Sequence, residues 1–230
     1  MELLEAMRTT GAVRAFTDES VSDETIRSIL DAARFAPSGG NRQSWHVIVV
    51  RDGATRRTVR DIYLGAWHEY VAHVLAGVVP FSPVATPADR SAAQARYDDA
   101  VRASRPDGFP ETLDTVPVML VICADLTAFA ATDRDLNRYQ FIGGASIYPF
   151  VWNILLAARE HDLGGVMTTV AVRNEPDLLE ALRIPPNYAV AAVVALGHPQ
   201  QRLTTLKRRG VAAFTTVDTF DGPGLADVAE

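Results

Sequence analysis

Residues 36–50 read APSGGNRQSWHVIVV, a loop rich in turn formers that runs directly into a continuous apolar stretch. The segment before it, from Ser22, carries apolar residues at helical spacing. That helix must stop before Pro37, because the residue preceding a proline is pushed out of helical geometry. The apolar stretch Trp45–Val50 predicts a buried strand. A helix, a tight loop and a buried strand in succession predict a domain that layers helices on a sheet.

The rest of the chain repeats this alternation and predicts an α+β class, with mixed α/β layers. The predicted strands are apolar on both faces, so helices are expected to cover both sides of the sheet. Pro149 lies either in the first turn of a long helix or at a kink within it. The further strands are expected at Val116–Cys123, Gly164–Thr169 and Tyr188–Leu196, and the further helices at 2–9, from 135 or 145 to 161, and 176–182.

The chain is expected to form a single domain over residues 1–230, because no linker or internal repeat divides it. The stretch 54–114 starts with a helical pattern and then turns irregular, with five prolines. A long, poorly patterned stretch inside a compact domain is more often a binding element than filler, so residues 60–112 are predicted to be a variable, lid-like insertion. Residues 211–230 are predicted to be a C-terminal arm.

Several function classes are disfavoured by composition and spacing. A net charge of −6 argues against nucleic-acid binding, which needs a basic face. The absence of a long apolar run and of a signal-peptide pattern predicts a cytoplasmic protein without a membrane partner. His68 and His73 are five residues apart, about 140° around a helix, which does not suit a metal site. Cys123 lies in an apolar run and is expected to be buried and unreactive.

The loop from 36 to 45 carries more polar chemistry than a turn requires. The amides of Asn41 and Gln43 offer paired donors and acceptors that can match the edge of a planar heterocycle, and glycines let backbone amides approach it. A loop that only ends a helix is the alternative interpretation, since turn formers are common there. From these residues alone both interpretations remain open.

Several segments together resemble the nitroreductase family. The loop Ala36–Trp45 is similar to the family's A-P-S-x-x-N-x-Q-P-W, and Val13–Phe16 is similar to the end of its R-R-S-x-R-x-F motif. Matches in a shared order are more specific than any single motif, and only residues 60–112 and about the last dozen lie outside them. The later matching segments are Asn153–Arg159 with Leu163-Gly164, Ile184–Pro199, and Lys207–Arg209, which resembles the family's K-x-R.

The resemblance implies a nitroreductase-like fold with a central, mostly antiparallel sheet, and a homodimer with the FMN site at the subunit interface. It implies non-covalently bound FMN, NADPH or NADH as the electron donor, and a small organic acceptor of the nitroaromatic or quinone type. The cofactor performs the chemistry in such enzymes. No side chain need act as a base, so none is assigned as catalytic.

The resemblance also assigns cofactor-binding residues by position. Arg14 matches the arginine that meets the phosphoribityl tail of FMN, and Lys207 and Arg209 match the pair that grips its phosphate. Thr168 and Thr169 match positions whose backbone amides face the flavin near N5, where negative charge develops on reduction. The residues that match the loop reaching the partner subunit's flavin are Pro37, Ser38, Gly39 and Asn41.

The N-terminal motif departs from the family's pattern. Aligned on Arg14 without a gap, the family's R-R-S falls on 10–12, which offers no guanidinium. A short gap instead places Arg8 as the replacement cation and Thr10 as the replacement hydroxyl. We favour the gap because a dianionic phosphate needs compensating charge. The alternative is that Arg8 is a solvated residue that ends the first helix.

Two other functions compete with the reductase hypothesis. One is a different flavin reaction on the same scaffold: reductive dehalogenation, flavin destruction or reduction by a deazaflavin donor. The other is a non-catalytic, flavin-sequestering protein, suggested by the altered N-terminal motif. The natural acceptor and the choice between NADH and NADPH cannot be inferred from the sequence.

Overall fold

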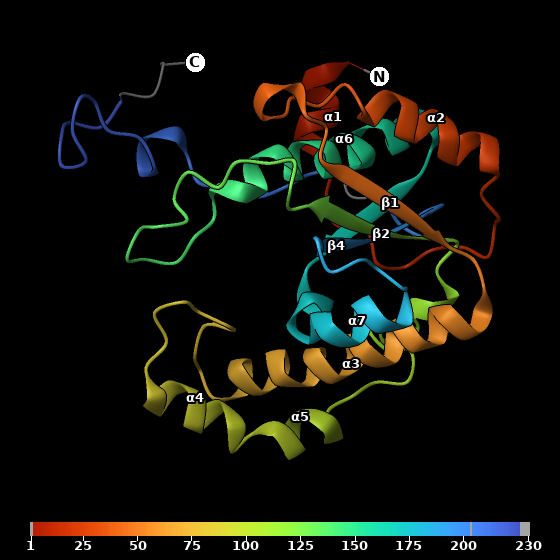
Figure 1. Cartoon of the computed structure of the whole chain (residues 1–230), viewed down its shortest axis with the longest axis horizontal. Helices are drawn as coiled ribbons and strands as arrows, with labels where there is room; N and C mark the ends of the chain where they lie inside the picture. The colour runs from red at the N-terminus through yellow and green to blue at the C-terminus, as the bar shows by residue number, and fades with distance from the viewer. Residues whose placement is uncertain (1, 203, 226–230) are drawn as a thin grey trace.

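The computed structural model describes residues 2–202 and 204–225, which form two helical layers around one sheet (Figure 1). The sheet contains β1 (Trp45–Val50), β2 (Val118–Asp125), β3 (Gly164–Thr168) and β4 (Tyr188–Gly197). The strand order is β1-β2-β4-β3, and every neighbouring pair is antiparallel. The predicted α+β class, the four strands and the antiparallel sheet are therefore confirmed.

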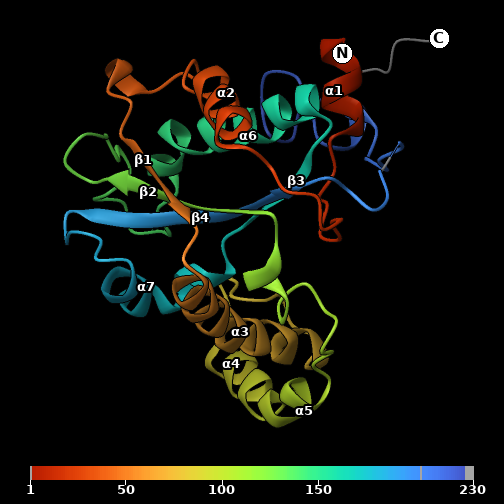
Figure 2. The same ribbon diagram turned by 90° about the vertical axis from the view of Figure 1, so that its right-hand side faces the viewer.

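One face of the sheet is covered by α2 (Asp23–Ala33) and α6 (Tyr148–Ala158), as Figure 2 shows edge-on. Leu120 and Ile122 of β2 point into this layer. Ser22 is the N-cap of α2, as predicted, because its hydroxyl accepts a hydrogen bond from the backbone amide of Thr25. Pro149 lies in the first turn of α6, where no helical amide bond is lost. The helix starts later than either predicted position, since residues 142–146 form a separate 3-10 turn.

The other face is covered by α3 (Gly53–Leu75) and α7 (Glu175–Ala181). Met119 and Val121, which alternate with the residues of the first face, pack here against Val59 and Tyr63 of α3. The first half of α3 therefore belongs to the core of the domain. α1 (Leu3–Thr9) lies on the side of α2 and α6 in Figure 2.

The predicted lid-like region contains more helix than its prolines suggested. α3 continues to Leu75, and α4 (Pro87–Gln94) and α5 (Tyr97–Arg102) follow it. Pro87 sits in the first turn of α4, behind a capping box formed by Thr86 and Asp89. The prolines thus begin helices as well as interrupt them. α4 and α5 lie beside the second half of α3, away from the sheet (Figure 2).

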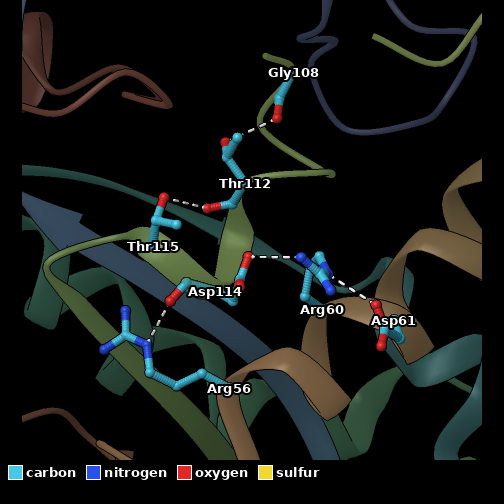
Figure 3. A network of polar contacts seen from close by, with 7 residues as sticks. All are labelled: Arg56, Arg60, Asp61, Gly108, Thr112, Asp114 and Thr115. Carbon is cyan, nitrogen blue, oxygen red and sulfur yellow. Dashed lines mark hydrogen bonds and ion pairs between the residues drawn. The ribbon is translucent and has the colours of Figure 1, made fainter. Parts of the chain in front are cut away.

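The return segment from this region is fastened to α3 by a polar network (Figure 3). Arg56 donates from Nε to the carbonyl oxygen of Asp114 at 2.8 Å, and also to the carbonyl oxygen of Val116. Arg60 forms an ion pair with the Asp114 carboxylate at 3.1 Å and another with Asp61 at 2.8 Å. These bonds fix both ends of the α3–α5 unit to the sheet. Across residues 2–202 and 204–225, no helix is long and apolar enough to cross a membrane.

Candidate cofactor site

The N-terminal segment that carries Arg14 is held against the edge of the sheet. The Val13 amide donates to the carbonyl oxygen of Gly165 in β3 at 2.9 Å. On the other side, the amide of Gln200 donates to the carbonyl oxygen of Ala15 at 3.0 Å. Arg14 lies between these two anchors and is exposed. The segment is therefore fixed by its backbone while its cationic side chain faces outward.

One glycine in β3, Gly164, allows this close approach, and the next, Gly165, allows β3 to pack against β4. A Cβ on Gly164 would lie 2.7 Å from a methyl group of Val13. A Cβ on Gly165 would lie 2.4 Å from Leu196 Cδ2 and 2.5 Å from the carbonyl oxygen of Ala195. Glycine at these positions is thus required for packing. The glycine turn of the sequence serves to dock the N-terminal segment.

A buried arginine anchors the end of α1. Arg159, at the end of α6, is 8% exposed, and its Nη1 donates to the hydroxyls of Thr9 at 3.2 Å and Thr10 at 3.3 Å. Burial lowers the pKa of Arg159. The Thr10 hydroxyl also donates to the carbonyl oxygen of Ala6 at 2.7 Å. The Thr10 hydroxyl therefore points into the protein, where it bonds to Arg159 and Ala6. In this rotamer it does not serve as the phosphate ligand that was predicted.

Thr168, at the end of β3, contacts Tyr63 in α3. The Thr168 hydroxyl donates to the Tyr63 hydroxyl at 3.3 Å, and Tyr63 is 2% exposed. Burial raises the pKa of Tyr63, while the Thr168 hydrogen bond and the charge of Arg14 act in the opposite direction. Arg14 and Thr168, both predicted to contact the cofactor, are therefore both carried by segments at β3: Val13 is bonded to Gly165, and Thr168 is the last residue of the strand.

β3 is an edge strand, and its outward side is open beyond Gly165. Gly165 faces outward, because its carbonyl oxygen accepts the Val13 amide. Since alternate residues of an antiparallel strand share an orientation, Thr168 pairs with β4, whereas Thr169 follows the outward series. Of the two predicted amides, the geometry favours that of Thr169 for contact with a ligand at this edge.

The loop at 37–43 has a defined and strained shape. Its backbone is left-handed at Gly40, Asn41 and Gln43, with φ of 61°, 53° and 49°. The Ser38 hydroxyl accepts the Gln43 amide at 3.0 Å, and the Gly39 amide donates to Ser146 Oγ at 3.1 Å. Non-glycine residues in this conformation often mark functional sites. Pro37, Gly39 and Asn41 are exposed, and Ser38 is partly exposed.

Trp45 closes this loop but has a structural role. Its ring stacks on Phe150 of α6 at 4.6 Å with an interplanar angle of 1°. The side chains of Asn41 and Gln43 bond to each other at 3.2 Å. The amides are thus arranged as a pair on the surface, while the tryptophan belongs to the core.

Lys207 and Arg209 lie in an extended, exposed segment after β4. Within residues 2–202 and 204–225, no hydrogen bond or ion pair joins them to the N-terminal segment, and neither they nor Arg8 and Arg14 form an ion pair. The four predicted phosphate ligands are therefore exposed cations whose charge is not neutralised by a described carboxylate.

These features fit a planar cofactor with a phosphate tail. The exposed cations supply charge for a dianion, and each charge-assisted hydrogen bond contributes roughly 1.5–3 kcal/mol. At the open edge of β3, the backbone amide of Thr169 is available beside the buried side chain of Tyr63. The residues could bind FMN, orient its ring at the sheet edge and stabilise negative charge that develops there.

Other reactive groups have structural partners. Cys123 is 1% exposed, and burial raises the pKa of its thiol to about 11, which keeps it protonated. His68 contacts Ser104 Oγ at 3.1 Å, whereas His73 Nδ1 donates to the carbonyl oxygen of Glu69 at 2.7 Å. In the described part of the chain, no three potential ligands are close enough together to hold a metal ion.

Sequence reasoning missed Tyr63 and Arg159. The signal for Arg159 was present, because it follows the buried Leu155 and Ala158 on the apolar face of α6, an unusual place for a charge. Tyr63 carried no such signal, since α3 has no clear apolar stripe and the partner that defines its role comes from β3.

Comparisons with known proteins identify the family and the fold. A Thermus thermophilus NADH dehydrogenase is 29% identical over 195 residues, which is 83% of each chain. A Desulfovibrio desulfuricans protein solved in complex with FMN is 26% identical, covers 96% of this chain and 98% of its own, and has a TM-score of 0.62. An iodotyrosine deiodinase bound to FMN and 3-iodo-L-tyrosine shares the fold, with a TM-score of 0.65 at 19% identity, covering 95% and 100%. The sequence profile of the nitroreductase family matches residues 7–198, and the chain belongs to that family.

Proposed function

We propose that the protein is an FMN-dependent oxidoreductase that takes hydride from NADPH or NADH and reduces a small nitroaromatic- or quinone-type acceptor. One observation carries the proposal: the segment that carries Arg14 is bonded through Val13 to Gly165 of β3, and the same strand ends at Thr168, whose hydroxyl meets Tyr63. Family membership and the FMN-bound relative support the choice of cofactor.

Bound FMN would supply the hydride-accepting chemistry, and the protein would supply binding and orientation. Arg14, Lys207, Arg209 and Arg8 would hold the phosphate. The Thr169 amide would stabilise negative charge at the reduced ring. No side chain at this edge is placed to act as a base, so proton uptake is assigned to solvent.

We also propose a homodimer in which the 37–41 loop reaches the partner's cofactor. Several large apolar side chains are exposed, and exposed apolar surface often marks a protein–protein interface. The C-terminal arm projects from the same side as the segment around residues 126–147 (Figure 1). Light scattering on purified protein tests this, and a mass of one chain would refute it. The exposed side chains include Phe35, Tyr139, Phe141, Phe214 and Phe220.

The absorbance spectrum of the purified protein tests the function. We expect a flavin spectrum that NADPH or NADH bleaches without oxygen and that a nitroaromatic or quinone restores. Flavin that neither donor reduces would indicate storage or a deazaflavin donor. Rapid loss of flavin with oxygen would indicate flavin destruction, and turnover limited to halogenated acceptors would indicate dehalogenation. Failure to bind FMN at micromolar concentration would refute the proposal.

Substitution of the predicted phosphate ligands separates their roles. Arg14→Met and Arg8→Ala should each weaken FMN binding at least tenfold, about 1.4 kcal/mol. Arg57→Met is the matched control, because Arg57 is an exposed arginine at the start of α3. Unchanged affinity in Arg8→Ala would support the alternative in which Arg8 is merely solvated.

A further inference from the structure

A cavity lies between α3 and α4 of the lid-like insertion, residues 60–112, and the 3-10 turn Val170–Asn174. Its volume is about 390 Å³, within the range of small-molecule sites. Nothing in the proposed flavin site uses its lining. Thr169, which is predicted to contact the cofactor, is the N-cap of this 3-10 turn, so the turn connects the candidate cofactor site to the cavity.

One wall of the cavity is aromatic. The rings of His73 and Phe81 are 4.9 Å apart, and the guanidinium of Arg173 lies 5.6 Å over the Phe81 ring. Tyr97 lines the opposite side from α5. Aromatic rings and a stacked guanidinium suit a planar heterocycle.

The cavity also carries net positive charge. Arg173 is neutralised by Glu69, with Nε 2.9 Å from the carboxylate. Arg90 is different: its Nη1 donates to the carbonyl oxygen of Ala85 at 2.6 Å, and it forms no ion pair with a carboxylate in residues 2–202 or 204–225. Arg90 is thus a guanidinium with free donors at the rim, suited to a phosphate.

A row of stacked rings connects the two sites. Trp67 stacks on Tyr63 at 6.3 Å and on Tyr70 at 5.1 Å, and Tyr70 lies 6.4 Å from Phe81. The cavity residues of α3 are six to ten positions beyond Tyr63, roughly 9–15 Å along the helix. A compact acceptor at the sheet edge could not span that distance. A ligand with two ring systems joined by a flexible linker could.

We propose that this cavity binds the adenosine end of the electron donor, and that Arg90 recognises the additional phosphate of a phosphorylated nicotinamide dinucleotide. The adenine would lie against Phe81 and His73 while the nicotinamide reaches the edge of β3. The proposal rests on the proposed function and deepens it, because it assigns NADPH over NADH as the donor.

Calorimetric titration of the FMN-loaded protein with adenosine 2′,5′-bisphosphate tests the proposal without turnover. Wild type should bind this probe at least tenfold more tightly than adenosine 5′-monophosphate, and Arg90→Met should abolish the difference. In kinetics, Arg90→Met should reduce the NADPH-over-NADH preference in kcat/KM at least tenfold. Arg102→Met removes the same charge on neighbouring α5, outside the cavity, and should retain both preferences.

Equal binding of the two probes, or an unchanged preference in Arg90→Met, would overturn the assignment of the cavity. Flavin reduction by either donor would then leave the proposed function intact. If neither donor reduced the flavin, the proposed function would fail separately. The titration would still show whether the cavity holds the phosphorylated adenosine.

Discussion

Replacement of Gly165 by alanine tests the packing of β3 against β4, which positions the Gly165 carbonyl group that docks the N-terminal segment through Val13. The added Cβ would lie 2.4 Å from Leu196 Cδ2 and 2.5 Å from the carbonyl oxygen of Ala195. Both atoms belong to β4 in the centre of the sheet, where the main chain cannot move aside. Gly165 has no positive φ, so the cost is purely steric. Overpacking of this kind costs about 3 kcal/mol, and the less flexible unfolded chain offsets about 0.4–1 kcal/mol.

The net loss of about 2–2.5 kcal/mol should lower Tm by roughly 4–10 °C in a domain of this size. Differential scanning calorimetry measures this directly, and FMN affinity should fall in parallel because Val13 and Arg14 are displaced. Gly210→Ala is the matched control, since a Cβ there meets nothing within 4 Å. A fall in Tm below 2 °C, or an equal fall in the control, would show that the sheet edge accommodates a side chain and would refute the docking argument.

Three further predictions follow from buried groups. Arg56→Met leaves carbonyl groups without donors and should cost about 2–4 kcal/mol in urea unfolding, whereas the exposed Arg57→Met should change little. Arg159→Met removes the buried donor that anchors Thr9 and Thr10 at the end of α1, so Arg8 should be less well positioned; FMN titration should show weaker binding, with partial rescue by Arg159→Lys, and an unchanged affinity would exclude a positioning role. Since burial raises the pKa of Cys123 from 9.0 to about 11, thiolate is about 100-fold scarcer than in the unfolded chain. The thiol should react with a disulfide reagent only after denaturation, and stability should be lost as pH rises through 9 to 11.

Much of the fold was predictable because local signals agreed with tertiary packing. Ser22 caps a helix in isolation as it does here, and Trp45–Val50 is apolar enough to be a strand in any context. The predicted start of α6 was too early, because residues 142–146, which include two glycines that disfavour an α-helix, form a separate 3-10 turn. α4 was missed since Pro87 was taken as a helix breaker rather than a first-turn residue.

The candidate site was predictable only as a set of residues. The roles of Arg14, Thr168 and Lys207 follow from family resemblance, but that Thr168 meets Tyr63 depends on packing between α3 and β3. Spacing along the chain contains no information about such a contact. The inward rotation of Thr10 has the same origin, because its partner Arg159 is distant in sequence.

The aromatic row along α3 has an optical consequence. Trp67 is stacked between Tyr63 and Tyr70, beside the proposed flavin site, whereas Trp45 is stacked on Phe150 in the other layer of the domain. The indole of Trp67 would therefore transfer its excitation to a flavin bound at the edge of β3 in the same subunit. The protein contains its own fluorescent reporter of cofactor occupancy, and no external label is needed to follow loading.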